Sequence, residues 1–319
     1  MSVKFYITID TEEDNWGEYH THGATVENIE SISILQELFD KYGAIPTYLV
    51  NYPVVQSDES GLIRNIYRSG RCSVGSHCHP WNTSPFEEEL NLHNSMLCNL
   101  PYTLVLAKLD TLHKAIIKRF GDPPRCFRAG RWGFGPQVAR SIHKIGYLVD
   151  TSVSPFIDWS SDGGPDYTST TMIKYRFNYN DIRSIDSRGC LVEVPATVGF
   201  WQKNYILCSR LRKWIISSKL NKIHLLGLLD RLRIVNLRWL SPELSNGNEM
   251  ITLARSIIRS GCNFLNMSFH STSLLPGKGP FVRSENDLED FFKRIDDILK
   301  FARDNGIIFA PLDEAHKIW

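Results

Sequence analysis

Short apolar runs alternate with longer helical patterns through the first 150 residues, and this alternation restricts the fold more than any other feature of the sequence. Five runs have the length and composition of buried strands: 3–10, 46–50, 72–79, 126–129 and 147–153. The segments between them carry apolar residues at helical spacing, and Gly43 and Gly146 suit the ends of two of those helices. Strands that alternate with helices form a parallel sheet with the helices outside it. The pattern returns near the end of the chain, with runs at 262–270 and 306–312 and a helix at 285–304.

A long segment, 152–240, interrupts this pattern. Its first part, 152–190, is rich in Asp, Ser, Thr, Gly and Pro, whereas 203–240 is apolar and basic, with nine Lys or Arg and Asp230 as the one acid. A chain of 319 residues is normal for one α/β barrel. We therefore expect a single domain, 1–319, in which 152–240 is an insertion that forms substrate-side loops and basic helices.

The basic segment 203–240 has two interpretations. Clustered Lys and Arg on apolar helices bind anionic membranes or acidic glycans. Alternatively, one or two amphipathic helices pack on the barrel and leave their basic faces solvated. From the sequence alone the second interpretation is preferred.

Composition places the chain among soluble globular proteins, with 42% hydrophobic and 22% charged residues. A net charge of +1 gives no reason to expect nucleic acid, and no obligate protein partner is indicated. The seven cysteines are scattered and form no CxxC pair, which favours reduced thiols. The first strand begins almost at Met1 with no leader pattern, and no run of 18 apolar residues occurs. These features predict a cytoplasmic protein, with the inner face of the membrane as one place where it could act.

Polar residues gather where the predicted strands end. Asp10 and Glu12 follow the first strand, and His77 and His79 end the third. Arg128 and Arg131 follow the fourth, Asp150 ends the fifth and His270 ends the run at 262–270. In parallel α/β sheets and barrels, active sites lie at the carboxyl ends of the strands. Separate strand ends are therefore expected to deliver these groups to one site.

The spacing of two within the first two pairs is informative, because side chains two apart on a strand share a face. One carboxylate with two imidazoles is a familiar metal-binding set that leaves positions open for water and substrate. His77 and His79 are therefore expected to be metal ligands rather than ordinary core histidines. Cys78 would point the opposite way and pack.

Other residues near these strand ends have two possible roles each. Glu13 and Asp14 are expected to cap a helix or face solvent. Arg128 could pair with Asp10 and lower the pKa of that carboxyl, or form a structural pair with Asp150, and the sequence does not separate these cases.

Aromatic and titratable residues close to the strand ends complete the candidate site. Trp81 follows the turn at Pro80 and could wall a pocket, and Trp132 is expected to be exposed. His270, with an ordinary pKa near neutrality, is a candidate general acid.

These motifs together resemble the polysaccharide deacetylases, the NodB-homology group of carbohydrate esterase family 4. "TIDTEED", "GSHCHPW", "FRAGRWG", "DTSVSP" and "MSFHSTSLLPG" resemble the five family motifs and occur in the family's order. The resemblance implies a distorted (β/α) barrel, often with seven strands. Two departures matter: Thr11 separates Asp10 from the next acid, and the two histidines are spaced by two residues rather than four.

The resemblance also implies a mechanism, metal-dependent removal of N-acetyl or related acyl groups from an amino sugar. The sugar would belong to a cell-surface polysaccharide or its lipid-linked precursor. Glu12, His77 and His79 would hold one divalent ion, with Zn²⁺ the first choice. Asp10 would be the base, held ionised by Arg128, and His270 the acid. The candidate substrate contacts are Trp81, Arg131, Trp132 and Asp150.

Two rival functions remain. The departures at Thr11 and in the histidine spacing are compatible with a catalytically silent, glycan-binding relative whose metal site is altered. A barrel hydrolase of the amidohydrolase type also uses HxH at a strand end, but usually after the first strand. Here HxH follows the third strand, so this alternative ranks lower.

Overall fold

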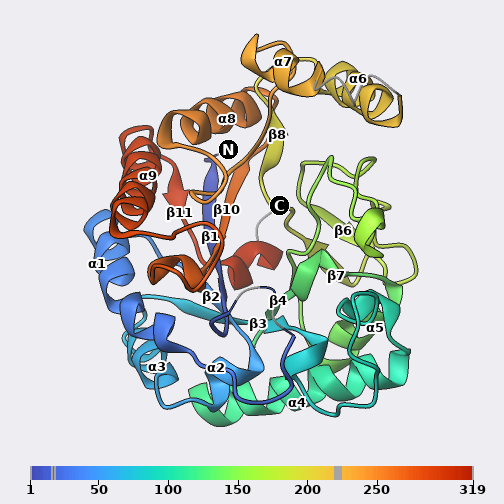
Figure 1. Cartoon of the computed structure of the whole chain (residues 1–319), viewed down its shortest axis with the longest axis vertical. Coiled ribbons are helices and arrows are strands. Elements are labelled where there is room, and N and C mark those ends of the chain that lie inside the picture. The colour runs from blue at the N-terminus through green and yellow to red at the C-terminus, as the bar shows by residue number, and fades with distance from the viewer. Residues whose placement is uncertain (1, 16, 18, 219–224, 318–319) are drawn as a thin grey trace.

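The computed structural model describes residues 2–15, 17, 19–218 and 225–317. Seven parallel strands form a curled wall in the order β10-β1-β2-β3-β4-β5-β7, and β6 adds an antiparallel edge beside β7 (Figure 1). The predicted α/β barrel is therefore confirmed. The described strands are β1 Lys4–Thr11, β2 Thr47–Val50, β3 Ser73–Cys78, β4 Cys126–Ala129, β5 Val149–Asp150, β6 Tyr175–Phe177, β7 Leu191–Glu193, β8 Val198–Phe200, β9 Leu237–Trp239, β10 Phe264–His270 and β11 Ile308–Phe309.

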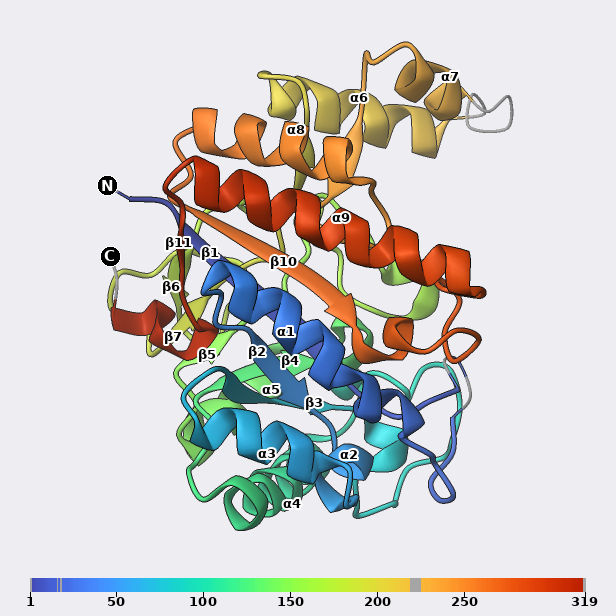
Figure 2. The same ribbon diagram turned by 90° about the vertical axis from the view of Figure 1, so that its left-hand side faces the viewer.

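Helices cover the outside of this wall, and Figure 2 shows α1, α9 and α8 side by side on one flank. Apolar side chains of the strands and of the inner helix faces form one large core, as the near-continuous apolar strands of a parallel sheet require. The longer helices are α1 Ile32–Tyr42, α2 Tyr52–Gln56, α3 Ser60–Arg68, α4 Tyr102–Phe120, α5 Pro136–Ile145, α6 Tyr205–Ser217, α7 Leu225–Arg231, α8 Gly247–Arg259 and α9 Glu285–Asp304. Gly43 and Gly146 follow α1 and α5 in the left-handed conformation, as predicted.

The ring is distorted where β7 meets β10. Within the described part of the chain no strand ladder joins these two strands. Instead, the Thr197 amide donates to the Asn266 carbonyl at 3.1 Å, and the Asn266 amide donates to Thr197 Oγ1 at 2.8 Å. Irregular backbone therefore closes the ring at this one junction, which we call the seam.

Two details differ from the prediction. The run at 306–312 is not a strand of the ring: β11 pairs only with the beginning of β1, and the short helix Leu312–Lys317 then packs at the amino ends of the strands. The seventh parallel strand is instead β7, which lies inside the predicted insertion 152–240. Three residues are too few to give a periodic signal, so this strand is not visible in the sequence.

A helical pair projects from the barrel beside the seam. The antiparallel strands β8 and β9 form a two-stranded neck, and α6 and α7 lie beyond it at the top of Figure 1. We call residues 203–218 and 225–234 the arm; residues 219–224 of the predicted basic segment lie outside the described residues. In the described chain, no helix combines the length and the apolar character needed to cross a membrane. All seven cysteines are free.

Candidate metal centre and active site

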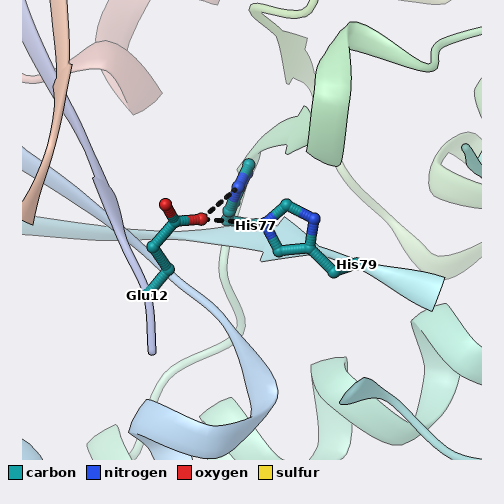
Figure 3. Close-up of side chains that lie close together, drawn as sticks. All are labelled: Glu12, His77 and His79. Atoms are coloured by element: carbon teal, nitrogen blue, oxygen red, sulfur yellow. Dashed lines mark hydrogen bonds and ion pairs between the residues drawn. The ribbon is translucent and has the colours of Figure 1, made fainter. Parts of the chain in front are cut away.

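Glu12, His77 and His79 meet at the carboxyl ends of β1 and β3. One ligand atom from each lies within 4.8 Å of the others, and all three residues are buried. Figure 3 shows the Glu12 carboxylate directed at both imidazole rings. Glu12 Oε2 lies 2.8 Å from His79 Nε2 and 3.4 Å from His77 Nε2. Because the backbone stays extended at His79, both rings face the same side, whereas Cys78 packs in the core.

The hydrogen bonding of His77 shows that these residues fit a cation. Its Nδ1 lies 3.1 Å from the Arg128 carbonyl oxygen, which only accepts, so Nδ1 carries the hydrogen. Nε2 faces the Glu12 carboxylate, which only accepts, so either the proton of an imidazolium or a bound cation lies between the two groups. Burial lowers the pKa of His77, but the nearby Asp10 and Glu12 carboxylates outweigh it and raise that pKa. For Glu12, burial opposes ionisation, yet its bonds to the two histidines leave its pKa below the usual range.

The position of His79 depends on a glycine from another motif. A Cβ at Gly130 would lie 2.2 Å from His79 Nδ1 and 2.8 Å from the Cys78 carbonyl oxygen. The imidazole also packs against Trp81, with ring centroids 4.1 Å apart and ring planes tilted by 32°. Gly130, at the end of β4, therefore leaves the space into which the His79 ring fits.

Asp10 lies beside the metal cluster and is held by Arg128. Arg128 Nη1 donates to Asp10 Oδ1 at 2.6 Å, and both side chains are almost completely buried. Burial raises the pKa of Asp10, but Arg128, His77 and His270 together hold it below the usual range. Of the two pairings left open by the sequence, the direct bond is the one between Arg128 and Asp10.

His270 faces Asp10 across the floor of the pocket. Its Nε2 lies 3.7 Å from Asp10 Oδ2, while Nδ1 lies 3.0 Å from Glu243 Oε2. The Glu243 carboxylate also accepts from the His270 amide at 3.0 Å, so the ring is fixed in orientation. Burial lowers the pKa of His270, but Glu243, Glu12 and Asp10 outweigh it and raise that pKa to about 9. These carboxylates favour the protonated form of the imidazole.

A cavity of about 380 Å³ opens over these groups. Asp10, Glu12, His77, His79 and His270 all line it. Its walls are rich in aromatic rings: Tyr19, Trp81, Trp132, Trp159, Trp239 and Phe281. Flat aromatic faces beside titratable groups suit a ligand that is apolar on one face and polar at its edges, as a sugar ring is.

The predicted substrate contacts separate into two groups. Trp81, Arg131 and Trp132 line the cavity. Arg131 and Trp132 both have positive φ, 52° and 58°, a conformation that non-glycine residues rarely adopt and that concentrates at functional sites. Asp150 does not line the cavity: it is fully buried, accepts from Ser152 Oγ at 2.8 Å and is hydrogen-bonded to the Glu193 carboxyl group. The structure therefore places Asp150 behind the pocket rather than in contact with a ligand.

Several polar residues fix the loop that follows the histidines. Glu13 accepts from Trp81 Nε1 at 3.0 Å and from Asn82 Nδ2 at 2.9 Å. Lys108, buried in α4, donates to three carbonyl oxygens, those of Pro80, Thr83 and Pro85. Asp14 accepts from the amides at the start of the short helix Glu27–Ser31, in line with the capping role predicted for it.

Two solved structures are similar to the chain over almost its whole length. One, from Mycobacterium smegmatis, is assigned as a polysaccharide deacetylase. It is 14% identical, with a TM-score of 0.50, and the match covers 98% of this chain and 93% of that one. The other, from Parabacteroides distasonis, is assigned as a glycoside hydrolase or deacetylase. It is 11% identical, with a TM-score of 0.59, and the match covers 100% of this chain and 70% of that one. The chain has the polysaccharide deacetylase fold.

The resemblance inferred from the motifs is thus confirmed at the level of the fold. No protein-family model and no curated protein matches the sequence. Within this polysaccharide deacetylase fold, the segments "TIDTEED", "GSHCHPW", "FRAGRWG" and "MSFHSTSLLPG" all contribute side chains to one cavity.

Some residues of the site are not predicted by the sequence. Glu243 has no motif around it and follows the three-residue strand β9, which gives no periodic signal. Trp159 and Trp239 come from the loop after β5 and from β9, and reach the cavity only because the chain folds back over the barrel. An acid beside His270 could be expected, but the sequence offers many acids and no means of choosing among them.

Proposed function

We propose that the protein is a metal-dependent hydrolase that removes acyl groups, N-acetyl in the first instance, from an amino sugar of a glycan. The observation that carries this proposal is the arrangement of the Glu12, His77 and His79 cluster beside the facing pair Asp10 and His270, all in one aromatic cavity. The polysaccharide deacetylase fold supports the same reaction class.

The three clustered residues would hold a divalent ion. Two imidazoles and a carboxylate are a usual set for Zn²⁺ at a catalytic site, although other divalent ions accept them too. When bound, the ion would polarise the amide carbonyl and lower the pKa of a water molecule.

The protein's own residues would carry the protons. Ionised Asp10 would accept a proton from the attacking water. Its Oδ2 would be the accepting atom, because Arg128 Nη1 donates to Oδ1. Protonated His270 would donate its Nε2 proton to the amide nitrogen as the C–N bond breaks. The products are acetic acid, which ionises in water, and a free amine; Asp10 is then protonated and His270 neutral, and transfer of a proton from Asp10 to His270 restores both groups. Glu243 would hold His270 in the tautomer that presents Nε2 to the substrate.

The aromatic walls support a glycan as substrate. Trp132 and Trp159 lie parallel, with ring centroids 6.5 Å apart, and Trp239 lies 5.2 Å from Trp132. Such faces pack against the C–H face of a pyranose. We further propose, as the sequence suggests, a cell-surface polysaccharide or its lipid-linked precursor as substrate and the cytoplasm as the location.

The deciding experiment measures metal content and acetate release together. Parent protein purified without chelator should hold about one equivalent of metal and release acetate from N-acetylated oligosaccharides. His79→Ala should lose both properties, whereas His143→Ala, on the exposed face of α5, should keep both. No metal in the parent after reconstitution with zinc, together with retained glycan binding, would instead establish the silent, glycan-binding function.

A further inference from the structure

The arm exposes an unusual number of large apolar side chains. Of the fifteen such side chains that are exposed in the described chain, seven lie between residues 206 and 234. On α6 and α7 and just after them these are Ile206, Leu207, Trp214, Ile216, Leu228, Leu232 and Ile234. Exposed fractions reach 60% for Leu207 and 57% for Trp214. A concentration of this kind marks an interaction surface, since apolar side chains scattered singly are the norm elsewhere.

Packing of the arm on the barrel does not account for these residues. A small cluster separate from the main core, formed by Phe156, Phe200, Cys208 and Val235, takes up the inward face of α6. Ile215 is buried as well, on the same helix face as Cys208. The interpretation preferred from the sequence, amphipathic helices with solvated basic outer faces, therefore fits the inner side only. The outer side is apolar as well as basic.

The charge of the outer side identifies its partner. Five exposed side chains of the arm are basic, namely Lys203, Arg210, Lys213, Arg231 and Arg233. The one acid of the arm, Asp230, binds Arg238 at 2.6 Å and Asn236 at 2.9 Å at the neck. Apolar side chains interleaved with uncompensated positive charge are typical of helices that lie in the interface of an anionic bilayer.

We propose that the arm docks the protein on an anionic lipid surface. Ile206, Leu207 and Trp214 would enter the boundary between headgroups and acyl chains, and the arginines and lysines would meet the phosphate groups. In this arrangement the arm helices lie in the plane of the lipid surface and do not cross the bilayer, for which no described helix is long and apolar enough.

The neck places the docking surface next to the cavity. β9 leads from the arm directly into the cavity wall, to which Trp239, Ser241, Glu243 and Leu244 contribute. Leu244, at the cavity rim, is itself 53% exposed. In Figure 2 the arm lies outside α8. α7 is on the side to which the arrowhead of β10 points, and the strands end in the pocket on that side. A docked protein would hold its cavity close to the headgroups, where a lipid-linked substrate would be found.

Vesicle co-sedimentation tests this proposal without metal or substrate, and so independently of the proposed activity. The full-length protein should sediment with vesicles of phosphatidylcholine and phosphatidylglycerol at low salt, and far less at high salt or with phosphatidylcholine alone. The double variants Leu207→Ser with Trp214→Ser, and Arg210→Glu with Arg231→Glu, should each weaken binding by at least about tenfold.

Matched controls carry the same changes elsewhere. Ile34→Ser with Ile185→Ser alters two equally exposed apolar residues, and Arg68→Glu with Lys118→Glu alters two exposed basic ones. Both should bind like the parent. Absence of binding to anionic vesicles, or equal loss in the controls, would overturn the proposal. So would a dimer in light scattering that the arm variants dissociate while vesicle binding is absent, since the arm would then cover a second copy of the chain.

Discussion

At the pocket end of the barrel, titratable side chains are buried and bonded to one another. In the arm, many large apolar side chains are about half exposed. Arg128 and Asp10 illustrate the first region, and Leu207 and Trp214 the second. Both arrangements lower the stability of the folded chain: burial of charged groups costs desolvation free energy, and exposed apolar groups gain nothing from burial. The comparison teaches that the two regions depart from the usual distribution of polar and apolar side chains in opposite ways, and each departure supports one of the two proposals: a cation and substrate at the pocket, and a lipid surface at the arm.

The largest effect is expected from removing the carboxylate that we propose as the base, Asp10. Asp10→Asn keeps the shape of the side chain and one acceptor for Arg128, but cannot take a proton from water. We expect kcat/KM for acetate release to fall by about 10²–10⁴-fold. Metal content should stay at the parent value, and a loss of less than about tenfold would exclude Asp10 as the base.

The next largest effect is expected from replacing Lys108, the buried lysine that binds the loop after His79. Lys108→Met removes the donor to three buried carbonyl oxygens and should lower the free energy of unfolding by about 3–5 kcal/mol in urea titration. Lys114→Met, on the exposed side of the same helix, should change it by less than about 0.5 kcal/mol. Equal effects of the two variants would contradict the anchoring role.

A methyl group at Gly130 tests how His79 is positioned. Gly130→Ala should displace the imidazole from Glu12 and weaken metal binding by about 10–100-fold in competition with a chromophoric chelator. Gly61→Ala, where the nearest atom to the new Cβ would be 3.6 Å away, is the control. Parent-like affinity in Gly130→Ala would show that His79 is not a ligand.

The charge of Glu243 should be visible in the pH profile. His270 acts as donor only while protonated, so activity should fall as the pH rises through its pKa of about 9. Burial lowers this pKa and Glu243 is the first of the groups that raise it, so Glu243→Gln should move the alkaline limb to lower pH. Glu243→Asp should restore part of the shift. An unmoved limb in Glu243→Gln would assign that limb to another group.

The smallest effect is expected in the arm, where two neighbouring isoleucines differ in burial. Ile216 is 45% exposed and Ile215 only 1%. Ile216→Ala should change the free energy of unfolding by less than about 0.5 kcal/mol, and Ile215→Ala should lower it by about 2–5 kcal/mol. A destabilising Ile216→Ala would mean that the outer face packs against the protein itself, which contradicts the comparison.

The sequence predicts the long, regular parts of this molecule well. The helix at 285–304 and the glycines that end α1 and α5 agree with the structure, because each has a local signal that tertiary contacts do not alter. The histidine pair is equally local, since its spacing alone puts both rings on one face.

What the sequence does not predict depends on contacts between distant segments. Glu243 reaches His270 from the segment that follows β9, and a glycine is needed at position 130 because His79 and the Cys78 carbonyl lie against it. β7 is too short to detect, and Asp150 ends a strand like its neighbours yet is covered by the chain behind the pocket. These contacts form only once distant segments of the chain have come together in the barrel.

The neck has a consequence for how the protein can vary. Val198 pairs with Trp239 and Phe200 with Leu237, so the chain leaves the barrel and returns to it at adjacent points beside the seam. Trp201 and Gln202 close the end of the neck nearest the arm by bonds to Asn236. The arm is joined to the rest of the chain through the neck and through the packing of Cys208 on Phe156, at a distance along the chain from the residues of the metal cluster. A shorter or different segment between these two points would therefore change the docking surface while the strand ends that carry the pocket keep their own contacts.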